Sequence, residues 1–359
     1  MKTSIVLGTR PEIIKFSPII RKCERLGLDY FILHTGQHYS YNMDRVFFEQ
    51  LELPGAKCNL DVGSGTHAEQ TGKMLIGIER VLHEEGPDLV LVEGDTNSVL
   101  AGALAAVKLG IKVGHVEAGL RSYDRQMPEE INRVLADHCS DLLFAPTQKS
   151  KCILLGEGIR EDKIFVTGNT IVDAVYQNLE ISKRKGDFHD KLNVENGGYF
   201  LATVHRQENV DDEKRFRGIL KGLEMAHEEF GFPVIYPIHP RAEKQLKVFA
   251  IQANGIKIIE PLDYLSFLQL ESNAKLVLTD SGGVQEEACI LGVPCVTLRD
   301  NTERPETLEV GANVLTGTNP NKIVDRIKFM LGRKNDWKNP FGDGKAGERI
   351  IEVLRHGFD

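Results

Sequence analysis

Three acidic side chains lie where apolar runs of the sequence end, in positions from which they could move protons. Asp95 follows one such run, and Glu117 follows the next, 22 residues later. This spacing is about one strand-helix-strand step, so both carboxylates should emerge at the same edge of a parallel sheet. Glu129, directly after Pro128 at an expected helix start, adds a third acid. Three acids at one rim favour general acid and base chemistry.

Each acid also has a plain structural interpretation. Asp95 would cap the helix that is expected to begin at about Asn97. Glu129 would pair with Arg133 one turn further along its own helix. The sequence leaves these alternatives open.

The segment TDSGGVQEE, at residues 279–287, has the pattern of a phosphate cradle. Ser281, Gly282 and Gly283 lie between an apolar strand and an expected helix start. Glycines let a ligand approach the backbone, and the first N–H groups of a helix attract anions. Glu287 lies one turn inside this helix, where a carboxylate could hold ribose hydroxyls. A tight strand-to-helix turn of an α/β domain is the alternative.

Basic side chains occur at other strand ends. Arg10 and Lys15 belong to the segment GTRPEIIK, which is not a G-x-G-x-x-G sequence and so disfavours a dinucleotide site. His205 and His239 each end an apolar run, and Arg304 follows another in the segment DNTERPE. A cation at a strand tip suits an anionic ligand, although surface charge and structural histidines remain alternatives.

Composition excludes several classes of protein. The net charge of −8 and the pI near 5.8 argue against nucleic acid or an anionic membrane surface as a partner. The six cysteines form no C-x-x-C pair, so we expect reduced thiols, no metal and a cytoplasmic protein. No apolar run reaches the roughly 18 residues that a membrane span requires, and the N-terminus leads directly into a strand.

Short apolar runs alternate with amphipathic segments along the 359 residues, which predicts α/β architecture with parallel sheets. The length favours two domains, and we place their junction near residue 168, shortly before the polar segment 180–198. Two such domains that face each other would form one cleft for the ligand. The expected strands are residues 4–7, 30–34, 88–92, 112–116, 142–145, 200–204, 234–238, 256–259, 276–279 and 295–298.

In order along nearly the whole chain, the motifs resemble those of the non-hydrolysing UDP-N-acetylglucosamine 2-epimerases. They are GTRPEIIK, GDT, GHVEAGLR, PEEINR, VTGNT, SGGVQEE and DNTERPE. The resemblance implies two Rossmann-like domains of the GT-B type: residues 1–168 with the catalytic acids, and residues 169–343 with the UDP site. It also implies that a last helix, within residues 344–359, crosses back to the first domain.

The resemblance further implies roles for individual residues. Asp95, Glu117, Glu129 and His205 correspond to the catalytic set. The residues that correspond to ligands of the UDP-sugar are Arg10, Lys15, Phe267, Ser281, Gly282, Gly283, Glu287 and Arg304. Gln37 and His38 resemble part of a second, activating site, and His239 is a further candidate for such a secondary role. Leu262 stands where bacterial relatives often have glutamine near the uracil.

The activity implied is the interconversion of UDP-GlcNAc and UDP-ManNAc through elimination of UDP to 2-acetamidoglucal and its re-addition, with no cofactor. The expected partners are these two nucleotide sugars and UDP, in a homodimer. Three alternatives stay open: a GT-B glycosyltransferase, a 2-epimerase of a diacetamido uronic acid UDP-sugar, and a non-catalytic UDP-sugar binding protein.

Overall fold

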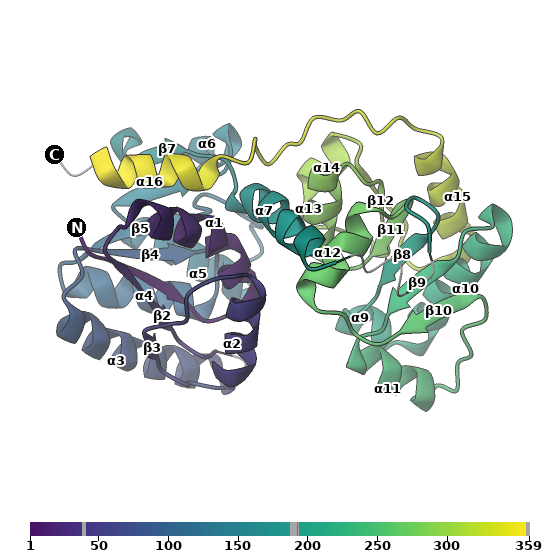
Figure 1. The fold of residues 1–359 in the computed structure, drawn as a ribbon, viewed down its shortest axis with the longest axis horizontal. Coiled ribbons are helices and arrows are strands. Elements are labelled where there is room, and N and C mark those ends of the chain that lie inside the picture. The colour runs from purple at the N-terminus through teal and green to yellow at the C-terminus, as the bar shows by residue number, and fades with distance from the viewer. Residues whose placement is uncertain (38–40, 187–191, 193, 357–359) are drawn as a thin grey trace. The chain divides into compact units, whose positions relative to one another are not determined.

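A computed structural model describes residues 1–37, 41–186, 192 and 194–356. The chain divides into two compact units (Figure 1). Unit 1 is Met1–Gln177 together with Phe341–Asp359, and unit 2 is Asn178–Pro340. The junction that we placed at residue 168 precedes helix α7 (Thr170–Arg184), whereas the observed division falls inside this helix.

The described strands of unit 1 form one parallel sheet of seven, in the order β3-β2-β1-β4-β5-β6-β7. The strands are β1 (Thr3–Leu7), β2 (Tyr30–His34), β3 (Cys58–Asn59), β4 (Leu89–Glu93), β5 (Lys112–Val116), β6 (Leu142–Ala145) and β7 (Ile164–Val166). The helices, besides α7, are α1 (Arg10–Leu26), α2 (Tyr41–Gln50), α3 (His67–Glu85), α4 (Asn97–Lys108), α5 (Pro128–Cys139), α6 (Gln148–Gly156), the 3-10 helix η1 (Glu161–Lys163) and α16 (Ala346–His356).

The described strands of unit 2 form a parallel sheet of six, in the order β10-β9-β8-β11-β12-β13. The strands are β8 (Phe200–Thr203), β9 (Val234–Pro237), β10 (Ile256–Ile259), β11 (Leu276–Thr279), β12 (Cys295–Thr297) and β13 (Asn313–Leu315). The helices are α9 (Gln207–Val210), α10 (Glu213–Phe230), α11 (Pro240–Val248), α12 (Tyr264–Ser272), α13 (Gly282–Leu291), α14 (Pro305–Glu309) and α15 (Pro320–Leu331).

The predicted α/β fold with two Rossmann-like parallel sheets is confirmed. All ten predicted strands occur, and their buried runs explain why: β1 and β4 are buried along their whole length. Three strands were missed, namely β3, β7 and β13, each at the edge of its sheet. They are two or three residues long and only partly buried, so they lack the apolar run that marks a central strand.

Each sheet has one point where the strand order reverses. In unit 1, β1 pairs with β2 on one side and with β4 on the other, and in unit 2, β8 lies between β9 and β11. The helices that follow the two central strands therefore leave in opposite directions, which opens a crevice beyond the carboxyl ends of the strands. Residues that follow β1, β4, β8 and β11 are placed there by topology alone.

Helix α4 can lie close to the unit 1 sheet because it is rich in alanine and has glycine at residue 102. A Cβ atom on Gly102 would lie 3.0 Å from Val92 and 3.2 Å from Val6, both in central strands. The backbone of α4 thus packs directly on β1 and β4. This close packing fixes the loop between β4 and α4, which carries Asp95.

Helix α16 returns the chain to unit 1, where it packs beside α1 (Figure 1). The Asp173 carboxylate in α7 caps its start by accepting hydrogen bonds from the N–H groups of Ala346 at 3.1 Å and Gly347 at 3.0 Å. Burial raises the pKa of Asp173, and the two hydrogen bonds partly oppose this rise. A buried cap between distant segments should stabilise unit 1.

We expect Asp173→Ala to destabilise the protein by about 1–2 kcal/mol, because the first N–H groups of α16 would lose their acceptor. Asp173→Asn should cost less, since asparagine can also cap a helix. Chemical unfolding followed by circular dichroism measures both changes. Asp29→Ala is the matched control at an exposed position, and an Asp173→Ala variant as stable as this control would contradict the prediction.

Candidate active site

Two clusters of functional side chains lie at the carboxyl ends of the strands, one in each unit. In unit 1, β4 and β5 end side by side, with Glu93 opposite Val116. Asp95 and Glu117 follow directly, so both leave the sheet at the same edge. The spacing of these acids in the sequence thus reflects their position on neighbouring strands.

Glu117 is held in a strained conformation by two neighbours. Its φ is +68°, in the left-handed region that residues other than glycine rarely adopt. The Lys15 ammonium lies 2.5 Å from its carboxylate, and the side-chain amide of Asn169 donates to the same oxygen at 3.0 Å. These contacts fix the carboxylate at the end of β5. Strain of this kind is common at active sites, where it is retained for function.

Lys15 also contacts Glu93, the last residue of β4, at 3.2 Å. Burial raises the pKa of Glu93 well above its ordinary value, although Lys15 opposes this rise, and the nearby Glu117 carboxylate adds to it. The ammonium group therefore lies between two carboxyl groups from adjacent strands. Its role as a ligand to an anion, expected from the sequence, remains a proposal.

Asp95 forms an ion pair with Arg133 of α5. Arg133 also contacts Glu130 at 3.1 Å, and Asn132 donates to the Asp95 carbonyl at 3.0 Å. Two plain structural interpretations from the sequence are therefore wrong. Thr96, and not Asp95, caps α4, and the described partners of Arg133 do not include Glu129.

Glu129, in the first turn of α5, is half-buried. In the part of the chain that the structure describes, its carboxylate makes no hydrogen bond or ion pair. It differs in this respect from Asp95 and Glu117, which are both held by cations. A half-buried carboxylate of this kind is available for a bound molecule.

Beneath these acids, His115 connects the loops that carry them. Its Nδ1 lies 2.7 Å from the Asp137 carboxylate and its Nε2 lies 2.8 Å from the Gly94 carbonyl oxygen. Asp137 also accepts the N–H of Gly119 at 3.2 Å and contacts Arg121 at 2.7 Å. Both ring nitrogens of His115 therefore face acceptors, which favours the doubly protonated imidazolium.

The pKa values agree with this assignment. Burial alone would lower the pKa of His115, but the Asp137 carboxylate and the Gly94 carbonyl raise it above its ordinary value. Burial would raise the pKa of Asp137, yet His115 and Arg121 lower it. His115, Asp137 and Arg121 thus form a buried ion network. It joins Gly94, the residue before Asp95, to Gly119, which lies two residues after Glu117.

Arg10 begins α1, after the turn that follows β1. Its guanidinium lies 3.6 Å from Asp44 and 5.7 Å from the ring of Phe47. The turn itself is fixed by the buried Glu12 carboxylate, which accepts the N–H groups of Gly8 at 2.6 Å and Thr9 at 2.8 Å. The turn is thus held in place by Glu12, whereas the side chain of Arg10 is partly exposed.

The expected secondary site is only partly described. The Gln37 side chain is buried in unit 1, where its oxygen accepts from the Ser98 hydroxyl at 2.9 Å. His38 lies outside the described residues. The bond with Ser98 uses the side-chain oxygen of Gln37.

Unit 2 contains a pocket of about 240 Å³ at the carboxyl ends of β8, β9, β10 and β11. It brings together four residues that the sequence singled out, His205, His239, Phe267 and Ser281, and it also includes Leu262. Apolar side chains form most of its lining. The lining residues are Thr203, Val204, His205, Pro237, Ile238, His239, Pro261, Leu262, Phe267, Ser281 and Val284.

The start of helix α13 forms one side of this pocket. Ser281 is the N-cap residue, and no side-chain hydrogen bond caps the helix in the described structure. A Cβ atom on Gly282 or Gly283 would find its nearest neighbour at 3.9 or 4.0 Å. The helix start is thus open, with N–H groups and partial positive charge suited to an anion.

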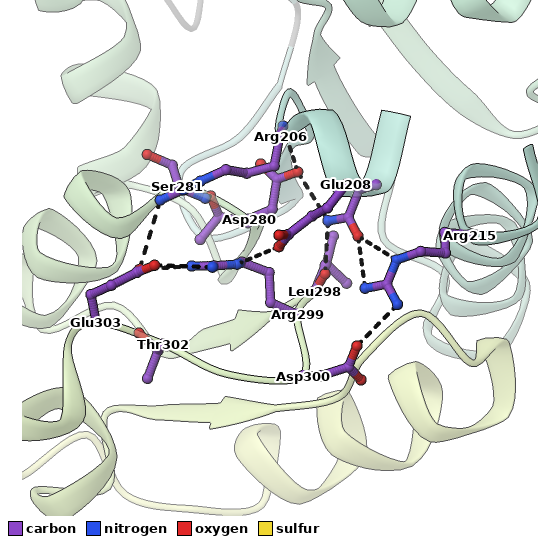
Figure 2. Close-up of polar contacts among 12 residues, drawn as sticks. Arg206, Glu208, Arg215, Asp280, Ser281, Leu298, Arg299, Asp300, Thr302 and Glu303 are labelled. Carbon is purple, nitrogen blue, oxygen red and sulfur yellow. Dashed lines mark hydrogen bonds and ion pairs between the residues drawn. The ribbon is translucent and has the colours of Figure 1, made fainter. Parts of the chain in front are cut away.

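Buried Asp280, just before this turn, fixes the loop after β8. It accepts the N–H group of Arg206 at 3.0 Å (Figure 2). It also accepts the N–H group of His205 at 3.1 Å and the side-chain amide of Asn209 at 3.1 Å, and His205 Nδ1 lies 3.2 Å away. Burial would raise the pKa of Asp280, but these contacts lower it. His205 is thereby anchored on one side while 40% of its side chain stays exposed.

The two arginines after β12 differ in their availability. Arg299 is buried and contacts Glu208 at 2.8 Å and Glu303 at 2.7 Å, so its charge is used within unit 2 (Figure 2). Arg304 is partly exposed and lies 2.7 Å from Glu286 of α13. Of the two, Arg304 is the one that pairs with a residue of α13, in the second turn of that helix.

His239 has a structural task in addition to lining the pocket. Its side chain accepts the N–H of Arg241 at 3.1 Å and so caps α11. Its ring lies 5.7 Å from that of His205. Burial and the nearby His205 lower the pKa of His239, which favours a neutral imidazole.

Four residues of the unit 1 cluster were not predicted as site residues: Glu93, His115, Asn169 and Arg133, which was considered only as a partner of Glu129. Glu93 and His115 stand within otherwise apolar strands, a pattern that signals a buried polar group with a specific partner. Arg133 and Asn169 carry no such local signal, because their partners are distant in sequence. Arg133 lies 38 residues from Asp95, and Asn169 lies 52 residues from Glu117, so only the fold brings each pair together.

Among the described residues, no group of three or more histidine, cysteine, aspartate or glutamate side chains is arranged to hold a metal ion. No described helix is both long and apolar enough to cross a membrane.

Comparison with known proteins adds independent findings. A sequence model of the UDP-N-acetylglucosamine 2-epimerase family matches residues 21–355. The chain is 60% identical over 364 residues to the UDP-N-acetylglucosamine 2-epimerase of Methanocaldococcus jannaschii, covering 99% of this chain and 100% of that protein. It is 42% identical to the UDP-2,3-diacetamido-2,3-dideoxy-D-glucuronate 2-epimerase of Pseudomonas aeruginosa, covering 99% of both chains.

Among solved structures, the M. jannaschii UDP-GlcNAc 2-epimerase in complex with UDP-GlcNAc and UDP matches with a TM-score of 0.88. The match has 60% sequence identity and covers 99% of this chain and 100% of that chain. The sequence and the fold of this chain are thus similar to those of the M. jannaschii protein over 99% of this chain.

The ion network under the acids gives a measurable prediction. Asp137→Asn should lower the pKa of His115 by about one unit or more, because it removes the opposite charge that favours the imidazolium. NMR titration of the His115 ring protons measures this shift. Asp29→Asn, which removes an exposed carboxylate, should leave the pKa unchanged, and an equal pKa in all three proteins would contradict the network.

Proposed function

The chain belongs to the UDP-N-acetylglucosamine 2-epimerase family, and we propose that it interconverts UDP-GlcNAc and UDP-ManNAc without a cofactor. The observation that carries the proposal is the combination of an open helix start in the unit 2 pocket with three acids in unit 1. The first suits a nucleoside diphosphate, and the second suits proton transfer at a sugar.

The nucleotide is assigned to unit 2. The Ser281 to Gly283 turn offers N–H donors and room for the diphosphate, and Arg304 lies beside the start of the same helix. Phe267 and Leu262 supply apolar surface for the uracil. Leucine at residue 262 cannot provide the side-chain hydrogen bond of a glutamine, so uracil recognition there must use backbone groups.

The chemistry requires more than a simple base. The C2 hydrogen of an N-acetylhexosamine has no neighbouring carbonyl to acidify it, so direct deprotonation faces a high barrier. If the C1–O bond breaks first, its electron pair leaves with UDP and the sugar gains oxocarbenium character. A carboxylate then removes the C2 proton to give 2-acetamidoglucal. Re-addition of UDP at C1, with a proton delivered to the other face of C2, gives the epimer.

Three acids and one histidine are the proposed catalytic set. Asp95 and Glu117 are fixed by Arg133 and Lys15, which suits groups that must meet a sugar in a set orientation. Glu129 is the third acid, and the order in which the three act is left open. His205, with the start of α13, stabilises charge that develops on the departing diphosphate.

Further features belong to the same proposal. We infer that the active protein is a cytoplasmic homodimer, and that Gln37, His38 and His239 are candidates for a secondary UDP-GlcNAc site. The relationship to the P. aeruginosa enzyme favours a second candidate substrate, a diacetamido uronic acid UDP-sugar. A direct comparison of both substrates decides between them.

Purified protein mixed with UDP-GlcNAc in D2O should form UDP-ManNAc without added NAD or metal, and deuterium should enter at C2. The solvent label follows from proton loss and return in the elimination route. One-dimensional NMR reports both the product and the label. Epimerisation without deuterium would refute the mechanism, and no epimerisation of UDP-GlcNAc would refute the proposed substrate.

Two variants should separate binding from chemistry. Gly283→Val should weaken UDP binding by about 1–3 kcal/mol, because the side chain enters the space where the diphosphate approaches the backbone. The unliganded protein has room for it, so folding should be preserved. Glu117→Gln should keep UDP affinity within a few fold but lose about a hundredfold or more in turnover.

Calorimetric titration with UDP and chromatography of the two UDP-sugars measure these effects, and each variant is the control for the other. Equal UDP affinity in Gly283→Val and wild type would place the nucleotide elsewhere. Normal turnover in Glu117→Gln would remove this acid from the catalytic set.

A further inference from the structure

The Glu12 carboxylate joins two loops of unit 1 that carry predicted site residues. One of its oxygens accepts the N–H groups of Gly8 at 2.6 Å and Thr9 at 2.8 Å. The Thr9 hydroxyl lies 3.0 Å from the same oxygen. The other oxygen accepts the hydroxyl of Thr96 at 2.5 Å, across 84 residues of sequence. One side chain thus connects the turn after β1 with the loop after β4.

The backbones of these two segments are packed directly against each other. A Cβ atom on Gly8 would lie 1.9 Å from the hydroxyl oxygen of Thr35 and 2.4 Å from that of Ser98, in the first turn of α4. Only glycine therefore lets the turn after β1 approach α4 so closely. The two hydroxyl groups lie 2.8 Å apart and are hydrogen-bonded. The Glu12 bridge thus lies in a tightly packed part of unit 1.

Helix α3 of the same unit shows what Glu12 does beyond capping. Glu69 is the third residue of α3 and accepts the N–H of Thr66 at 3.0 Å, as Glu12 does for Thr9 in α1. Both helices thus begin with a capping box. Glu69 is exposed and its described hydrogen bonds stay within this local motif, whereas Glu12 is buried and reaches Thr96. Capping alone does not require the additional bond.

Hydrogen-bond donors carry the burial cost of the Glu12 carboxylate. Glu12 forms no ion pair with any described residue, so these donors are what stabilises its charge. Burial raises the pKa of Glu12, and its hydrogen bonds, first among them that from Thr96, oppose this rise. The Thr96 oxygen accepts the N–H of Val99 at 3.4 Å as the cap of α4, which leaves the hydroxyl proton for Glu12.

The residues beside this bridge are those assigned to the reaction. Asp95 directly precedes Thr96. Lys15 lies one turn after Glu12 in α1 and contacts Glu117 at 2.5 Å. The bridge holds the start of α1 against the start of α4, so it sets the position of Asp95 relative to the Lys15 and Glu117 pair.

We propose that Glu12 is a positioning residue for the epimerase reaction: by binding the Thr96 hydroxyl, it fixes the loop that carries Asp95 against the start of α1. The inference rests on the proposed function, since it takes Asp95 and Glu117 as catalytic acids. Neither Glu12 nor Thr96 has to touch the sugar. The bridge acts on turnover, because a reacting group misplaced by about 1 Å can slow a reaction roughly a hundredfold.

Substitutions of Thr96 test the bridge. Thr96→Val keeps the shape of the side chain but removes the hydroxyl, and it should lower kcat for UDP-GlcNAc about tenfold or more. Its UDP affinity should stay within a few fold of wild type, because the nucleotide is assigned to unit 2. Thr96→Ala should behave in the same way, whereas Thr96→Ser keeps the hydroxyl and should restore kcat. Chromatography of the two UDP-sugars and calorimetric titration with UDP measure these effects.

The loss of a helix cap needs a matched control, and Thr147→Val provides it. Thr147 is half-buried like Thr96 and caps α6 by accepting the N–H of Ser150 at 3.1 Å. Its described side-chain hydrogen bonds are both with Ser150. Thr147→Val should therefore lose stability in chemical unfolding, as Thr96→Val does, but keep the wild-type kcat.

A double substitution tests whether the two side chains act together. In Glu12→Ala no carboxylate is left for Thr96 to meet, so adding Thr96→Val should cost little further turnover. In Glu69→Ala, which lacks the exposed capping-box glutamate of α3, Thr96→Val should keep its full effect. All variants are assayed at a temperature where circular dichroism shows them to be folded.

The outcomes are distinguishable. If wild-type protein epimerises UDP-GlcNAc but Thr96→Val and Thr96→Ala are as active as Thr147→Val, the positioning role is wrong while the proposed function stands. An equal loss of turnover in Thr96→Ser, or an equal cost of Thr96→Val with and without Glu12, would also overturn it. If wild-type protein does not epimerise UDP-GlcNAc, the proposed function itself fails, and this inference fails with it.

Discussion

The reversal of strand order in each parallel sheet is the constraint on which the candidate site depends. β1 and β4 in unit 1, and β8 and β11 in unit 2, are neighbours whose following helices leave in opposite directions. The backbone therefore opens beyond these strands, and side chains that follow them are gathered there. Asp95 and the Ser281 turn come directly after such strands.

Some of the side chains gathered at the sheet edge are paired with opposite charges, and this pairing decides which of them remain available to a bound molecule. In unit 1, Lys15 is shared by Glu93 and Glu117, and Arg133 is paired with Asp95. Glu129 has no such described partner. Buried charges without partners are costly, so most acids near the sheet edge are fixed by cations. The few that are not fixed are those that a bound molecule can reach.

Unit 2 uses another means of neutralisation. Asp280 is stabilised chiefly by hydrogen-bond donors, including backbone N–H groups after β8, and this holds His205 at the pocket while much of its ring stays exposed. Hydrogen-bond donors of this kind add no cationic side chain, so the start of α13 supplies the positive potential for an anion together with Arg304.

The sequence by itself determined the class of fold and the identity of the strand-end residues. Central strands such as β1 and β4 are continuous apolar runs because both their faces are buried, and the residue after such a run must lie at the sheet edge. The position of Asp95, Glu117, His205 and Ser281 followed from this local pattern. The edge strands β3, β7 and β13 lacked the pattern and were missed.

Only the tertiary structure decided how these residues are paired. The contacts of Arg133 with Asp95 and of Asn169 with Glu117 join segments that are distant in sequence. The fold also excluded two plain interpretations that the sequence left open, namely Asp95 as a helix cap and Glu129 as the partner of Arg133. Side-chain pairing depends on distance and burial in three dimensions, which periodicity along the chain does not encode.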